Sequence, residues 1–206
     1  MYAYVVGSVC GIVSSMDMKS TEFYNLMDNL NTFIKEAHIE DKLAVDLRSF
    51  FRYRRNTNSV EGWHDMLQLM SPALRGRVAV QITTWIHNVP FFEKCPSSML
   101  IELVFVLRSE TYPPFEEFIS SRDESKKMFI VKRGLVASRG RVYSQGKVLG
   151  EDMVFGASRR GYVARSLTYA DVYSLARDEL LAILDDYPEV AKKMRRIAIK
   201  FVFRQA

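Results

Sequence analysis

The residues whose types and spacing could bind a ligand lie in one run, 146–175. Gly150 and Glu151 are adjacent there, and Arg160 follows nine positions after the glutamate. A bound phosphodiester needs a backbone that approaches it closely, free N–H groups and a compensating cation. Gly150 allows the approach, a short helix beginning near Asp152 presents amides, and Arg160 can donate to two phosphate oxygens. Glu151 can then accept a hydrogen bond from a ribose hydroxyl, although the spacing alone also fits a turn and a surface charge.

The remaining polar residues give little support to other chemistry. The cysteines are Cys10 and Cys95. The histidines stand singly, without the close spacing of metal ligands: His38, His64 and His87. No nucleophile elbow marks a Ser-His-Asp or Cys-His centre. We therefore predict no metal site, no cofactor and no enzymatic activity.

The net charge of +5 is concentrated near the C-terminus. Residues 189–206 carry one acid, Glu189, and these basic residues: Lys192, Lys193, Arg195, Arg196, Lys200 and Arg204. Such a segment can meet an acidic partner or an anionic membrane surface, or it can form an ordinary solvated helix face. No groove of interleaved basic and aromatic residues and no recognition helix accompanies it, so we predict no nucleic-acid partner.

The first half of the chain is predicted to be helical. Residues 1–16 are apolar and uncharged but shorter than the roughly 20 residues that span a bilayer. They fit either a buried helix or the end of a membrane helix. Beyond them the apolar spacing predicts several helices, and the contact face of the second is expected to contain Leu43, Leu47 and Phe50. Ser71 and Pro72 are a typical helix start, because serine caps and proline tolerates the first turn.

From Ser109 onward the apolar residues no longer follow the helical spacing. Short runs between turn residues predict strands at 128–131, 135–138, 141–144, 148–149, 162–166 and 168–175. Glycines recur every four to six residues between these runs, which suits a small, tightly turning antiparallel roll. Helical spacing then returns at Leu180 and continues beyond Pro188. The order of helices, strands and helices predicts an α+β fold without the alternation of a parallel sheet.

Several segments of this sequence resemble parts of one protein family. The run from Gly150 through Arg160 to Pro188 is similar to the phosphate-binding cassette of cyclic-nucleotide-binding domains and the segment after it. Residues 125–136 resemble the strand and turn that begin the β-roll of those domains. Residues 69–92 resemble the helical C-linker of hyperpolarisation-activated, cyclic-nucleotide-gated and ether-à-go-go-type channels. Residues 1–16 resemble the cytoplasmic end of their pore-lining helix.

The resemblance implies the cytoplasmic gating module of a tetrameric potassium or monovalent-cation channel, at the cytoplasmic face of a membrane. Its expected parts are the end of the pore helix at 1–16, a helical C-linker at 17–95 and a cyclic-nucleotide-binding domain at 96–206. Within that domain we expect a jelly-roll at about 110–176 and C-terminal helices at 177–206. The expected partners are cAMP or cGMP, three further copies of the chain joined through the C-linker, and the membrane through the pore helix.

The resemblance also assigns roles to residues. Glu151 is expected to bind ribose and Arg160 the cyclic phosphate. The rest of the expected site comprises Gly150, Asp152, Met153, Gly161 and Tyr162. The last helix is expected to close over the ligand as a lid, although the same spacing fits a helix that simply packs on the roll. Its residues are Val190, Met194, Ile197 and Phe201.

Three features depart from the family pattern. Gly161 and Tyr162 stand where a threonine and a small residue are common, which removes one hydroxyl contact. The ring of Tyr162 could fill part of the pocket or stack on a base. Asp152 places a carboxylate near the proposed anion, and we expect it to weaken binding unless it points away or caps the helix. The chain ends at Ala206, so we expect the distal part of the lid to be absent.

Two other interpretations remain open. The roll could be a ligand-independent assembly or interaction module in which Tyr162 or the terminal helix plugs the pocket. A soluble cyclic-nucleotide-dependent regulatory subunit of a kinase would also contain the roll, but it leaves residues 1–16 and the linker unexplained. The presence of both Arg160 and Glu151 favours nucleotide binding.

Overall fold

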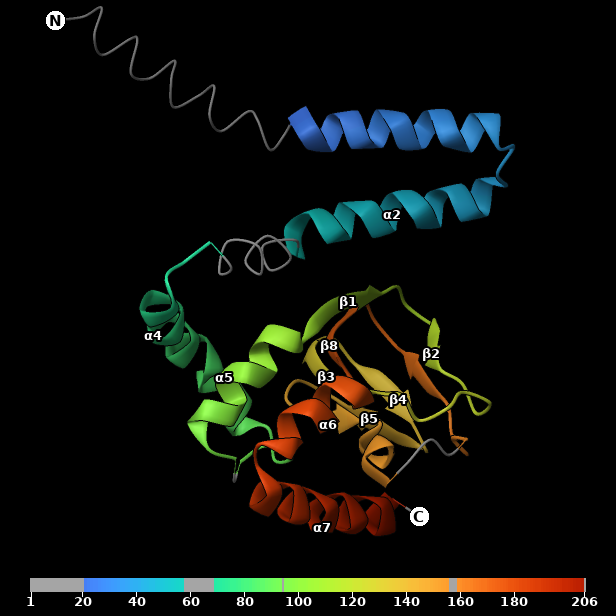
Figure 1. The fold of residues 1–206 in the computed structure, drawn as a ribbon. Coiled ribbons are helices and arrows are strands. Elements are labelled where there is room, and N and C mark those ends of the chain that lie inside the picture. Colours follow the sequence, from blue (N-terminus) through green and yellow to red (C-terminus); the bar gives the residue numbers. More distant parts are fainter. Residues whose placement is uncertain (1–20, 58–68, 94, 156–158, 206) are drawn as a thin grey trace, which may run out of the picture. The chain divides into compact units, whose positions relative to one another are not determined.

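The computed structural model describes residues 21–57, 69–93, 95–155 and 159–205, except for the side chains of 56–57, 79–80, 82–84 and 200–205. The chain packs as two compact units, Met1–Asn58 and Ser59–Ala206. The segment expected to end a pore helix, 1–16, lies outside the described residues. Helices precede the strands along the chain and two more helices follow them (Figure 1), which confirms the predicted α+β class. The functional boundaries after residues 16 and 95 stay predictions.

The described residues of the first unit, 21–57, form two helices, residues 21–36 and α2 (Asp41–Thr57). Ile34 of the first helix and Ala44 of the second are buried in one cluster. The prediction that Leu43 lies on the contact face is wrong, because Leu43 is 51% exposed and its neighbour Ala44 only 2%. The contact face of α2 contains Ala44 with the partly buried Leu47 and Phe51, so Leu47 lies on it as predicted and Leu43 does not.

Ahead of its strands, the described part of the second unit contains α4 (Pro72–Ile82), the 3₁₀ helix η1 (Thr83–Asn88) and α5 (Ser97–Val106). The Leu74 N–H donates to Ser71 Oγ at 3.4 Å, which confirms the predicted helix start. The helix that begins at Pro72 is followed directly by six residues in 3₁₀ geometry, Thr83–Asn88. That segment begins with two threonines, whose branched side chains lower helix propensity.

In the described part of the chain, the strands form two antiparallel four-stranded sheets. They are β1 (Arg108–Tyr112), β2 (Glu117–Ile119), β3 (Lys127–Arg133), β4 (Val136–Ser138), β5 (Arg141–Tyr143), β6 (Val148–Leu149), β7 (Ala164–Ser166) and β8 (Ala170–Ala176). One sheet has the order β1-β8-β3-β6 and the other β2-β7-β4-β5. Consecutive strands in the chain therefore often lie in different sheets, as the predicted antiparallel roll requires.

The first two strands were not predicted from the sequence. β1 reads Arg-Ser-Glu-Thr-Tyr and lacks an apolar alternation. It exists because it pairs with β8 along its whole length, from Arg108 opposite Ser174 to Tyr112 opposite Ala170. Its Glu110 carboxylate accepts a hydrogen bond from Ser174 Oγ at 2.6 Å. Long-range pairing thus creates a strand that local propensity does not specify.

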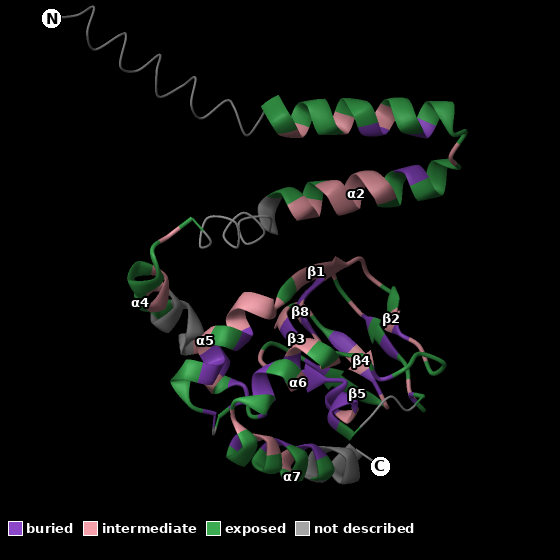
Figure 2. Ribbon diagram, viewed as in Figure 1, coloured by how far each residue is buried: buried purple, intermediate pink, exposed green. Residues whose placement is uncertain are grey.

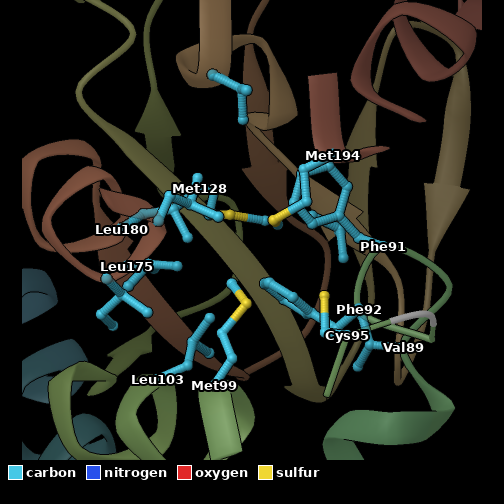
Figure 3. Packing of buried hydrophobic residues seen from close by; sticks show 14 of the residues in the cluster. Val89, Phe91, Phe92, Cys95, Met99, Leu103, Met128, Leu175, Leu180 and Met194 are labelled. Carbon is cyan, nitrogen blue, oxygen red and sulfur yellow. The ribbon is translucent and has the colours of Figure 1, made fainter. Parts of the chain in front are cut away.

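One hydrophobic cluster joins the helices to the first sheet. Phe91, Phe92 and Met99 are almost completely buried there, together with Met128 of β3. Figure 3 shows Met194 of α7 (Pro188–Gln205) meeting Met128 and Phe91 in this cluster. In Figure 2 the buried residues of this unit gather on the strands and on α5. The helix α6 (Arg177–Asp185) adds three further buried side chains.

The packing of α7 generates a stability prediction. Met194→Ala should lower the free energy of unfolding by about 2–4 kcal/mol, because the side chain is 1% exposed and its removal leaves a cavity. The matched control on the same helix is Ile199→Ala, whose side chain is 44% exposed and should cost less than about 0.5 kcal/mol. Urea unfolding measures both, and equal losses would show that α7 does not pack on the core through Met194.

Candidate functional site

The site is organised around a turn that only glycine can make. Gly150 lies between β6 and the 3₁₀ helix η2 (Glu151–Phe155) and has a φ of +88°. A Cβ added to it would lie 2.7 Å from the carbonyl oxygen of Lys127 and 2.7 Å from Nη2 of Arg160. The backbone at Gly150 therefore lies directly against β3 and against the arginine.

Arg160 is a buried cation. Its residue is 4% exposed, and its guanidinium donates through Nη2 to the Lys127 carbonyl oxygen. Nε donates to Asp152 Oδ2 at 3.3 Å. A guanidinium cannot lose its proton, so a buried one requires an anion and hydrogen-bond acceptors. In this structure Asp152 supplies the anion.

The Asp152 carboxylate points towards Arg160 and accepts hydrogen bonds from two further side chains. Ser125 Oγ donates to Oδ2, the oxygen that also faces Arg160, and Tyr162 OH donates to Oδ1 at 2.8 Å. Ser125 is completely buried. The sequence left open whether this carboxylate points away from the site or caps the helix. It points into the site, and its role is not limited to capping.

Glu151 is buried with an unsatisfied oxygen. The residue is 2% exposed, and Oε1 has no hydrogen-bond partner within the described residues. Desolvation raises the pKa of this carboxyl, while Arg139 and Arg160 lower it by their positive charge. A buried acceptor without a donor costs free energy. A ligand hydroxyl that donated to Oε1 would recover part of that cost.

Two guanidinium groups lie near the ring of Tyr162. Arg139 is 3.7 Å from the centre of the tyrosine ring and Arg160 is 5.9 Å from it, both within the range of cation–π attraction. Burial raises the pKa of the Tyr162 phenol, so it remains a hydrogen-bond donor to Asp152. The ring also packs against the hydrophobic cluster inside the roll.

The other predicted site residues differ in how they are placed. The Met153 N–H donates to the Gly150 carbonyl at 3.1 Å, so this amide is already used within the turn. The Met153 side chain is fully buried. Gly161 is exposed, with open space where a Cβ would be added. Direct contacts thus connect Gly150, Asp152 and Tyr162 with Arg160, and Glu151 lies within electrostatic reach of that arginine.

The predicted lid residues lie on one face of α7. Val190 and Met194 are buried and Ile197 is half-buried, whereas the side chain of Phe201 lies outside the described residues. The helix α7 contacts η2, and both contribute to the same hydrophobic cluster. The proposed ligand turn and the terminal helix are therefore mechanically connected.

Sequence reasoning missed two residues of this site, Ser125 and Arg139. Ser125 precedes β3 by two positions and reaches Asp152 only through the fold. Arg139 has a left-handed φ of 49° in the turn between β4 and β5, from which it reaches the Tyr162 ring. The recurring glycines predicted a turn there, but the sequence contains no signal for the ring contact.

The described residues were also considered for other sites. Among them, no group of three or more His, Cys, Asp or Glu side chains could hold a metal ion. No helix in the same ranges is both long and apolar enough to cross a membrane.

The chain is homologous over most of its length to cyclic nucleotide-gated channels. It is 26% identical over 206 residues to a cyclic nucleotide-gated channel of Caenorhabditis elegans, an alignment that covers 93% of this chain and 28% of the relative. It is 25% identical over 206 residues to the alpha-2 channel of Oryctolagus cuniculus, with 93% and 31% covered. It is 26% identical over 218 residues to the alpha-3 channel of Homo sapiens, with 97% and 31% covered.

These comparisons confirm the channel resemblance inferred from the sequence, and they agree with the prediction that the chain is not an enzyme. No family model matches the chain. The chain spans roughly a third of the length of these relatives, between 28% and 31%.

The close approach at Gly150 predicts a specific stability cost. Gly150→Ala and Gly146→Ala both place a side chain at a left-handed φ, +88° and +79°, which costs about 1–2 kcal/mol. Only the Cβ at 150 would meet backbone and Arg160 at 2.7 Å, whereas nothing lies within 4 Å of the Cβ at 146. Urea unfolding should therefore show a larger loss for Gly150→Ala, by at least about 1 kcal/mol. Similar losses in both variants would contradict the packing described for Gly150.

The burial of Glu151 predicts a pH dependence. Its pKa is raised above 4.5, so the folded chain holds this proton more tightly than the unfolded chain does. The stabilisation from protonated Glu151 is present below pH 4.5 and is lost as the pH rises through the raised pKa. The stability of Glu151→Gln relative to the unchanged chain should therefore increase between about pH 4 and pH 7 in urea unfolding. A difference that is independent of pH would show that Glu151 is not desolvated.

Proposed function

We propose that this chain is the cytoplasmic gating region of a cation channel and that its β-roll binds a cyclic nucleotide. One observation carries the proposal. A buried guanidinium, Arg160, lies against Gly150, and the next residue, Glu151, is a buried acid with an oxygen that has no partner among the described residues. The homology to cyclic nucleotide-gated channels supports the same conclusion.

The chemistry of the two groups fits the two polar parts of a cyclic nucleotide. A guanidinium donates in a fork to two oxygens of a phosphodiester, and the interaction is strong when water is excluded. A carboxylate oxygen that has no hydrogen-bond donor in the chain can accept a hydrogen bond from a ribose hydroxyl. Arg160 would thus bind the cyclic phosphate and Glu151 the ribose, while Gly150 permits the close approach of both. Either cAMP or cGMP carries these groups.

Coupling to a gate requires the ligand to favour one conformation of the module over another. The contact between η2 and α7 supplies a physical route, because Met153 of η2 and Met194 of α7 belong to the same cluster. We infer that Val190, Met194, Ile197 and Phe201 act as the lid. The linker, 17–95, would transmit the change to a pore-lining helix that ends in residues 1–16.

Assembly and location follow from the same proposal. The module would form a homotetramer through the linker and lie at the cytoplasmic face of a membrane, below a pore for potassium or another monovalent cation. Large apolar side chains are exposed on the helices of the first unit, as expected of surfaces that meet other subunits: Tyr24, Leu26, Phe33, Leu43 and Val45.

A second function is favoured by a different observation. Asp152 already neutralises Arg160, and Tyr162 and Ser125 hold it there. An Arg160 that is already paired within the chain fits a rigid, ligand-independent assembly module. Binding measurements separate the two functions.

The binding test compares two neighbouring arginines. The chain should bind a fluorescent cAMP analogue with micromolar affinity, and unlabelled cAMP or cGMP should displace it. Arg160→Ala should weaken binding by about a hundredfold, because a buried charged donor to the phosphate is lost. Arg159→Ala is the matched control, since Arg159 is exposed and its removal should leave affinity within about twofold.

Titration with both nucleotides also shows which of them is preferred. Absence of binding at millimolar ligand would support the assembly module. Equal losses in the two arginine variants would place the ligand elsewhere on the surface.

A further inference from the structure

Arg160 offers one buried positive charge for which two anions can compete. The side chain of Arg160 is 3% exposed, and its present partner Asp152 is 17% exposed at the side chain. Carboxylates and phosphates accept guanidinium hydrogen bonds with similar geometry. An anionic ligand that approached the same guanidinium would meet the Asp152 carboxylate already bound.

The Asp152 carboxylate is held in this place by groups that are suited to a carboxylate. Ser125 and Tyr162 both donate to it, one to each oxygen. Neither donor carries a charge, so both orient the carboxylate without neutralising it. With the Arg160 Nε–H, the carboxylate accepts from three side chains that come from two segments of the chain, one that contains Ser125 and one that contains Arg160 and Tyr162.

The surrounding charges make it unfavourable for a phosphodiester to bind Arg160 while Asp152 stays paired with it. Glu151 is a buried acid next to Asp152, and the Asp152 charge is one of the causes that raise the pKa of the Glu151 carboxyl. Lys127 contributes its carbonyl to Arg160, but its ammonium group pairs with Glu110 at 3.3 Å. A bound phosphodiester would add another negative charge beside these two acids.

We propose that Asp152 is an internal substitute for the ligand phosphate, which an anionic ligand must displace from Arg160 before it can bind. This inference rests on the proposed function, since it concerns the same guanidinium. It makes Asp152 a residue that sets affinity by competition rather than by contact with the ligand. Displacement of Asp152 from Arg160 would also be the event that starts the movement of the proposed lid. Asp152 belongs to η2, and η2 packs on α7.

The test is displacement of a fluorescent cAMP analogue from the full 206-residue chain. Asp152→Asn preserves the shape of the side chain, and its amide oxygen can still accept from Ser125 and Arg160, but the competing charge is removed. Binding of the analogue should therefore tighten by about tenfold, which corresponds to about 1.4 kcal/mol. Ligand should also raise the melting temperature of Asp152→Asn more than that of the unchanged chain. Glu124→Gln is the matched control. It removes an exposed acid beside Ser125 that pairs with Lys126, and affinity should stay within about twofold.

Tyr162→Phe provides a second variant if Asp152→Asn folds poorly. It keeps the carboxylate but removes one donor that holds it, so binding should tighten by about threefold. An equal gain in Glu124→Gln would attribute the effect to net charge and overturn the inference.

The remaining outcomes separate the inference from the proposed function. If the unchanged chain binds and Asp152→Asn binds equally or more weakly, the competition is refuted and nucleotide binding stands. If only Asp152→Asn binds, the competition is supported and the native chain is a ligand-independent module. If neither binds at millimolar ligand, both are refuted.

Discussion

A buried guanidinium that cannot lose its charge is the constraint on which the rest of the site depends. Arg160 is 4% exposed, so the fold must supply both an anion and acceptors for it. Asp152 supplies the anion and the β3 backbone supplies a carbonyl. Gly150 leaves the space in which the guanidinium lies, and no other residue could do so at this φ. Glu151 is left beside the pair with an oxygen that the described residues do not satisfy.

The same residues link the site to the core of the second unit. The turn at Gly150 leads directly into η2, whose Met153 enters the cluster that contains Met128 and Met194. A change in the position of η2 must therefore be accommodated by α7 or by β3, because close-packed interiors do not absorb displacement locally. The proposed lid helix is accordingly in contact with the proposed binding turn.

The sequence predicted those parts of the fold that have a strong local signal. The apolar β3 and β8 strands, the Ser71 cap and the buried face of α7 all follow from spacing and residue type. β1 could not be predicted, because Arg-Ser-Glu-Thr-Tyr becomes a strand only through its pairing with β8. On α2, Leu47 was placed on the contact face correctly, but Leu43 was placed there instead of Ala44, since the two positions fit the helical pattern almost equally well.

The site was only partly accessible from the sequence for a similar reason. The pattern of Gly150, Glu151 and Arg160 is local and was recognised. The direction of the Asp152 side chain depends on Ser125, which lies 27 residues upstream. Local spacing contains no information about a contact of that range, so the sequence identified an unusual carboxylate but not its partner.

A structure of the chain with bound cyclic nucleotide tests the central claim most directly. The Arg160 guanidinium should lie within roughly 3 Å of the phosphate oxygens and a ribose hydroxyl at the same distance from Glu151. A nucleotide bound elsewhere, with neither side chain in contact with it, would contradict the account.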